Sequence, residues 1–176
     1  MDRITRNRNA DYRDFPDKID WSTWDPNMHA TLLFILKGKE VLLIHKKTGL
    51  GAGKINAPGG KIEKGESPEQ AAVREVREEI KVEVDSPKEM GILRFQFVND
   101  ECLALHCTVF CASDFHGNPS ETVEAEPFWC DFDKIPYERM WADDAFWLPG
   151  MLSGKKFDGE FVFDGELMLW RSLRWR

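Results

Sequence analysis

The feature that most constrains this 176-residue chain is a helix-forming segment that carries three glutamates and closely follows a pair of glycines. Gly60 is followed after five residues by Glu66, and Glu66 after seven by Arg74-Glu75-Val76-Arg77-Glu78-Glu79. Each residue type is used at roughly one in fifteen positions, so these six glycine and charged positions coincide by chance at about 10⁻⁷ per register. The spacing therefore indicates a functional site rather than an accident of composition.

The segment predicts a helix from about residue 68 to 80. Ser67 is a typical N-cap, Pro68 suits the first helical position, and Gln70 stands where a capping box needs it. A buried stripe should follow from apolar residues that recur every fourth position. Its members are Ala72, Val76 and Ile80.

Glu75, Glu78 and Glu79 stand three and four residues apart, so they should share the face beside that stripe. Like charges at this spacing repel, and Mg²⁺ or Mn²⁺ would remove the penalty because hard cations prefer carboxylate oxygen. A solvated acidic face is the alternative. Arg74 either orients Glu75 or pairs with Glu78, and the two roles are compatible. Gly59 allows the backbone to approach a ligand closely and offers its carbonyl to a metal.

The composition limits the class of protein. The net charge is −7 and the pI is about 5.2, which argues against broad binding to the nucleic-acid backbone. No apolar segment is long enough to span a membrane, and the start has no signal-peptide core, so a cytoplasmic protein is expected. The four cysteines lack metal-site spacing and predict buried free thiols; they are Cys102, Cys107, Cys111 and Cys130.

The remaining pattern predicts one domain over residues 28–176, preceded by a polar extension over 1–27. Trp21 and Trp24 are the apolar residues through which the extension could pack on the domain. A monomer is expected, and a dimer through these tryptophans is the alternative. A second short helix is expected over 143–152, broken at Pro149 and Gly150. Strands mixed with two helices predict an α/β sandwich with a mixed sheet. The expected strands are 29–36, 41–45, 89–97, 103–112, 127–132, 157–163 and 167–170.

The spacing from Gly60 to Glu79 is that of the Nudix box, with Lys81 in place of its last glycine. The flanks resemble the MutT-homologue oxidised purine nucleoside triphosphatases of animals, over about residues 29–173. The resemblance implies an α/β/α sandwich with a mixed, mainly antiparallel sheet. Five stretches carry it: Gly49-Leu50-Gly51-Ala52-Gly53-Lys54-Ile55-Asn56, Pro58-Gly59-Gly60-Lys61, Met140-Trp141-Ala142-Asp143-Asp144, Phe146-Trp147-Leu148-Pro149 and Lys155-Lys156-Phe157-Asp158-Gly159.

The resemblance also implies roles for individual residues. The catalytic set would be Arg74, Glu75, Glu78 and Glu79, and the metal ligands Gly59, Glu75, Glu78, Glu79 and Glu124. The substrate would contact Thr31, Lys46, Asn56, Phe95, Phe97, Trp141, Asp143, Asp144 and Trp147. Trp141 would stack on the base while Asp143 and Asp144 bond its edge. Leu50 and Pro58 replace aromatic residues of the animal enzymes.

The residues alone leave other interpretations open. Asp143-Asp144 also suits a helix N-cap with an acidic first turn, Trp141 a core position, and Lys46 an ordinary surface lysine. The implied reaction is magnesium-dependent hydrolysis of a purine nucleoside triphosphate, such as 8-oxo-dGTP, to the monophosphate and pyrophosphate. The alternatives are a Nudix hydrolase for a dinucleotide polyphosphate, nucleotide sugar or RNA 5′ end, and a non-catalytic nucleotide sensor.

Overall fold

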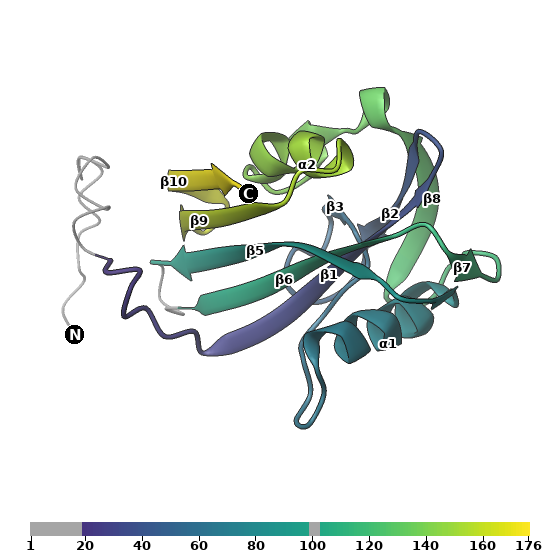
Figure 1. The fold of residues 1–176 in the computed structure, drawn as a ribbon, viewed down its shortest axis with the longest axis horizontal. Helices are drawn as coiled ribbons and strands as arrows, with labels where there is room; N and C mark the ends of the chain where they lie inside the picture. The colour runs from purple at the N-terminus through teal and green to yellow at the C-terminus, as the bar shows by residue number, and fades with distance from the viewer. Residues whose placement is uncertain (1–18, 99–102) are drawn as a thin grey trace, which may run out of the picture.

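The computed structural model describes residues 19–98 and 103–176. An eight-stranded sheet runs in the order β10-β9-β5-β6-β1-β2-β3, with β8 also paired to β2 (Figure 1). β1 pairs with β6, and β5 with β9, in parallel, whereas the other pairs are antiparallel. The strands are β1 (Met28–Lys37), β2 (Glu40–Lys46), β3 (Ile55–Asn56), β5 (Lys88–Phe97), β6 (Ala104–Ala112), β8 (Ala125–Asp131), β9 (Phe157–Asp164) and β10 (Leu167–Trp175).

The two helices, α1 (Pro68–Ile80) and α2 (Asp144–Leu152), cover opposite faces of the sheet (Figure 1). Side chains alternate along β1, so Phe34 enters the core beneath α2 while Leu33 and Ile35 enter the core beneath α1. This is the mixed, mainly antiparallel α/β sandwich that the sequence predicted. β4 (Glu83–Val84) and β7 (Phe115–His116) form a separate small sheet, and 3₁₀ turns occupy Phe132–Lys134 and Tyr137–Arg139.

Helix α1 begins as its sequence predicts. The Ser67 hydroxyl accepts from the Gln70 N–H at 3.1 Å, and the Gln70 side chain accepts from the Ser67 N–H at 2.9 Å, which completes the capping box. The predicted stripe of alanine, valine and isoleucine is fully buried. The helix ends at Lys81, which adopts a left-handed conformation with φ 62°. That conformation favours glycine, so the one position that departs from the Nudix box carries backbone strain.

Helix α2 corrects one prediction, because it continues through Pro149 and Gly150 instead of breaking there. Pro149 removes only the hydrogen bond to the carbonyl of Ala145, an exposed residue whose carbonyl water can solvate. Gly150 has a packing role, since a Cβ atom there would overlap the ring of Trp175. β10 also runs five residues beyond its predicted end at 170, with a register shift between Met168 and Trp170.

The segment before β1 docks through its tryptophans. The Trp24 indole N–H donates to Gln96 Oε1 at 2.9 Å, and the Trp21 ring stacks on Trp170 with centroids 6.0 Å apart. Three of the cysteines are free and buried, as predicted, and burial raises the pKa of Cys111 to about 12; Cys102 lies outside the described residues. In the described ranges, no helix is both long and apolar enough to cross a membrane.

Candidate active site

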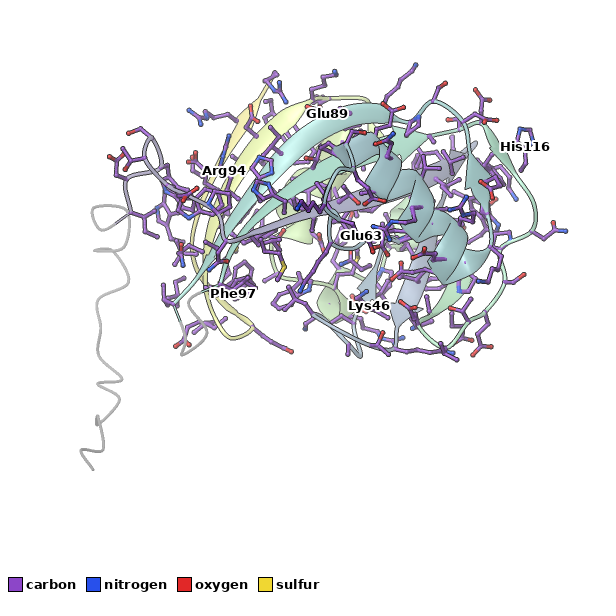
Figure 2. All side chains as sticks on the ribbon, turned by 90° about the horizontal axis from the view of Figure 1, so that it is seen from below. Lys46, Glu63, Glu89, Arg94, Phe97 and His116 are labelled. Atoms are coloured by element: carbon purple, nitrogen blue, oxygen red, sulfur yellow. The ribbon has the colours of Figure 1, made fainter. Side chains whose placement is uncertain are left out.

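A cavity of about 830 Å³ opens on the sheet and is lined both by α1 glutamates and by the turn that starts α2. Strands β1, β5 and β6 contribute much of its lining, Lys46 adds to it from the end of β2, and the loop that follows adds Gly49 and Leu50. Figure 2 shows Lys46 beside α1 and Phe97 farther from that helix, on β5. The cavity therefore joins the acidic side chains of α1 to a region with aromatic side chains.

Glu79 is the most buried of the α1 acids, with 1% of its surface exposed. Its Oε1 lies 3.2 Å from the Lys46 ammonium, and its Oε2 accepts from the Gly59 N–H at 3.0 Å. Burial raises the pKa of Glu79, although Lys46 and the Gly59 N–H both act against the rise. Lys46 is thus no ordinary surface lysine, because it contacts a buried carboxylate on the cavity wall.

Arg74 organises the rest of the acidic region. Its Nε and Nη2 donate to the two carboxylate oxygens of Glu66 at 2.6 and 3.0 Å, a bidentate pair that lowers the pKa of Glu66 to about 2. Its Nη1 donates to Glu75 at 2.8 Å and to Glu78 at 3.1 Å. Arg74 therefore contacts both Glu75 and Glu78, and its pair with Glu66 is a contact that the sequence did not predict.

The glycine pair sets the position of Glu75. A Cβ atom on Gly60 would overlap the Glu75 carboxylate, and one on Gly59 would overlap the carbonyl of Thr31. The glycines thus let the backbone lie against both β1 and α1. Burial raises the pKa of Glu75, although the Arg74 hydrogen bond opposes that rise.

The predicted acids occupy different places. Glu75, Glu79, Glu124 and the backbone of Gly59 line the cavity, whereas Glu78 lies outside its lining with 52% of its side chain exposed. The three α1 glutamates therefore do not share one environment, because α1 turns Glu79 toward the sheet and Glu78 toward solvent.

The donor set fits a hard divalent cation. The acidic region holds five carboxylates, those of Glu66, Glu75, Glu78, Glu79 and Glu124. The cationic side chains that bond to carboxylates of this region are Arg74 and Lys46. Within residues 19–98 and 103–176, no three His, Cys, Asp or Glu side chains already stand close enough to enclose an ion. An open set of carboxylate and carbonyl oxygens suits an ion that also takes phosphate oxygens and water as ligands.

The other region of the cavity is aromatic. Trp141 packs edge-on against Phe97 and Phe163, with centroids 5.9 and 5.5 Å apart. Phe95 and Asn56 also line the cavity, and the Asn56 carboxamide oxygen accepts from the Ala57 N–H at 2.8 Å. Trp147 differs from its expected place, since it is fully buried and does not line the cavity.

Asp143 and Asp144 line the cavity with 1% and 3% of their surfaces exposed. Asp143 Oδ2 accepts from the Trp147 indole N–H at 2.9 Å, and Asp144 Oδ2 from the Trp141 N–H at 3.1 Å. Asp143 stands at the N-cap position of α2 but makes no capping hydrogen bond, so the helix-cap interpretation fails for its side chain. Burial raises the pKa of Asp143 to about 6. Burial also raises the pKa of Asp144 well above its usual range, and repulsion by Asp143 adds to that rise.

Two buried polar atoms in the cavity have no hydrogen-bond partner among the described residues: the Thr31 hydroxyl and Asp143 Oδ1. Such atoms are costly in a folded protein and mark places where a ligand or water bonds. Sequence reasoning selected both residues but overlooked Leu93 and Cys107, which also line the cavity. The alternating pattern of β5 and β6 would have indicated these two, since they pair in register across the sheet.

Comparisons with known proteins agree with this geometry. The NUDIX domain family matches residues 26–150. The oxidized purine nucleoside triphosphate hydrolase of Danio rerio is 45% identical over 136 residues, which cover 77% of this chain and 86% of that protein. Its namesake from Mus musculus is 42% identical over 146 residues, covering 82% and 92%. The crystal structure of a MutT protein from Bacillus halodurans matches with a TM-score of 0.74 at 25% identity, covering 83% of this chain and 97% of that one. This chain therefore belongs to the Nudix hydrolase family.

Proposed function

We propose that this chain hydrolyses oxidised purine nucleoside triphosphates, such as 8-oxo-dGTP, to the nucleoside monophosphate and pyrophosphate, and so removes damaged nucleotides from the precursor pool. One observation carries the proposal: a buried aspartate pair with an unpartnered oxygen shares a cavity with the Nudix glutamates. The two relatives that carry the name of this activity match this chain over most of their own length.

Nudix hydrolases need divalent metal ions, and we propose Mg²⁺, with Mn²⁺ as a substitute, held by Glu75, Glu78, Glu79, Glu124 and the Gly59 carbonyl. Glu78 lies outside the cavity lining, so it would have to reach the ion from the solvent side. When bound, the metal neutralises phosphate oxygens and lowers the pKa of the attacking water. Arg74 keeps Glu75 oriented through a bidentate anchor on Glu66. One of the four metal-binding glutamates accepts the proton of the water.

The aromatic region would hold the base. Stacking on Trp141 contributes about 1–3 kcal/mol and depends little on base identity, so discrimination must come from the polar groups. Because the two buried carboxyls repel each other, we expect one of them to hold a proton while the other is ionised. A neutral carboxyl donates a hydrogen bond and a carboxylate accepts one. Such a pair bonds a purine edge that presents both an acceptor and a donor.

We further propose that the catalytic unit is residues 28–176 and that residues 1–27 lie outside it except for Asn27, which lines the cavity. We also propose that the protein is a cytoplasmic monomer without stable nucleic-acid binding. The net charge of −7 supports the last point. The direct test of function is pyrophosphate release with Mg²⁺ on a panel of 8-oxo-dGTP, 2-hydroxy-dATP, dGTP, a dinucleotide polyphosphate and ADP-ribose. The oxidised triphosphates should have the highest kcat/KM. A preference for the linked dinucleotides would instead indicate another Nudix activity, and no turnover on any substrate would indicate a nucleotide sensor.

A further inference from the structure

The C-terminal end of α1 is closed by the loop that carries Glu124. The last carbonyls of a helix lack partners within it, yet here each finds one. The Ile80 carbonyl accepts from the Ser120 N–H at 2.9 Å, the Glu79 carbonyl from the Thr122 hydroxyl at 2.7 Å, and the Glu78 carbonyl from the Lys81 ammonium at 3.1 Å. Two of the three donors belong to the loop between β7 and β8.

Thr122 is the most connected of these donors. Its hydroxyl donates to the Glu79 carbonyl and accepts from the N–H groups of Glu124 and Ala125, at 3.2 and 3.3 Å. A hydroxyl has one hydrogen to donate and two lone pairs, so all of its bonding capacity is used. The Thr122 N–H also donates to the Ala125 carbonyl at 2.9 Å, which closes a turn around Glu124.

Lys47, the residue that follows β2, holds the same turn from the other side. The Lys47 N–H donates to the Glu124 carbonyl at 2.8 Å, and its ammonium donates to the Thr122 carbonyl at 2.9 Å and contacts Glu121. The preceding residue, Lys46, bonds the Glu79 carboxylate. Two adjacent residues, the last of β2 and the one after it, thus bind both acids that Thr122 links.

We propose that Thr122 is a positioning residue that sets the place of Glu124 relative to Glu79 and so assembles the metal site from two separate segments. The inference rests on the proposed role of Glu124 as a metal ligand. Without the Thr122 hydrogen bonds, the exposed loop that carries Glu124 would have to become ordered each time the cation binds. Loss of hydrogen bonds that orient metal ligands typically weakens metal binding by about 10- to 100-fold.

The first measurement is the dissociation constant of Mn²⁺, without nucleotide, for the full chain by electron paramagnetic resonance. The second is the Mn²⁺ concentration that half-saturates turnover. Thr122→Val keeps the side-chain shape but removes the hydroxyl, and it should raise both values by about 10-fold. Saturating Mn²⁺ should restore kcat, since every proposed ligand is still present. Thr122→Ser restores the hydroxyl and should restore the wild-type values.

Ser153→Ala is the matched control, because the Ser153 hydroxyl caps the end of α2 by donating to the Gly150 carbonyl at 2.7 Å. It should leave Mn²⁺ affinity unchanged. If T122V fails to fold, Lys47→Met removes an exposed tether of the same turn and should raise the half-saturating Mn²⁺ concentration. The proposal is overturned if T122V binds Mn²⁺ as tightly as wild type. If T122V does not fold, the same result in K47M overturns it. It is also overturned if S153A loses as much Mn²⁺ affinity as T122V. Glu124→Gln distinguishes failure of the proposed ligand role of Glu124 from failure of the positioning role of Thr122. Normal Mn²⁺ affinity in E124Q refutes the ligand role of Glu124. Weakened affinity in E124Q with normal affinity in T122V refutes only the positioning role of Thr122.

Discussion

Replacing Asp143 with asparagine should change the stability of the protein in a pH-dependent way, with the variant gaining stability relative to wild type as the pH rises. The Asp143 side chain is almost fully buried, and burial raises its pKa from 3.8 to about 6. A rise of about two pKa units corresponds to about 3 kcal/mol of unfavourable free energy for the charged form.

The sign follows from which state holds the proton. Well below about pH 4 both the folded and the unfolded chain keep Asp143 protonated, so there is no penalty. Between about pH 4 and 6 the unfolded chain ionises first, and the free energy of unfolding falls as the pH rises. Above about pH 6 the full penalty is present. Asparagine does not titrate, so the stability of the D143N variant relative to wild type should rise by up to about 3 kcal/mol between pH 4 and 7.5.

Urea unfolding at 25 °C and several pH values measures this difference. Asparagine keeps an acceptor for the Trp147 indole but buries an NH₂ group beside the unpartnered Oδ1 position. That group costs about 1–3 kcal/mol at every pH, so the change with pH is the test rather than the absolute value. Asp25→Asn, at an exposed position, is the control and should show no such change. A D143N difference that stays flat from pH 4 to 7.5 would refute the buried-charge argument.

Three further predictions concern the helix, its end and the extension. Glu79→Gln should reduce turnover by orders of magnitude while the fold stays intact by thermal melting, because the residue is a proposed metal ligand that also bonds Lys46 and the Gly59 backbone; near-normal turnover would exclude it as a ligand. In urea unfolding, the Lys81→Gly variant should have a free energy of unfolding about 0.5–1 kcal/mol higher than the Lys81→Ala variant. Both variants lose the ammonium group, but only glycine adopts a φ of 62° without strain. Equal stabilities would show that the left-handed residue is unstrained. Deletion of residues 1–18 should leave kcat/KM within about threefold, whereas deletion through Asp25 should lower the melting temperature by removing the Trp21 stack and the Trp24 hydrogen bond; loss of catalysis in a shorter variant that still melts cooperatively would make the extension part of the active site.

Helix α1 was predictable to the residue because all of its signals are local. The capping box, the proline at its start and the apolar spacing lie within the same fourteen residues, 67–80. The order of the strands was not predictable in this way. β1 pairs in parallel with β6, about 75 residues later in the chain, and no local pattern encodes such a partner.

The acids of the site show where local pattern ends. Spacing placed Glu75, Glu78 and Glu79 on one face, but their separate environments depend on segments far along the chain. Lys46 and the Gly59 N–H bond the buried Glu79 carboxylate. Arg74 bonds Glu78 at the surface with one nitrogen, while the other nitrogens of Arg74 bond Glu66. Thr122 carried no sequence signal at all, because a threonine in an acidic loop is ordinary. Its role arises only when the loop returns to the end of α1, so the contacts that assemble the site are those that bring two distant segments together.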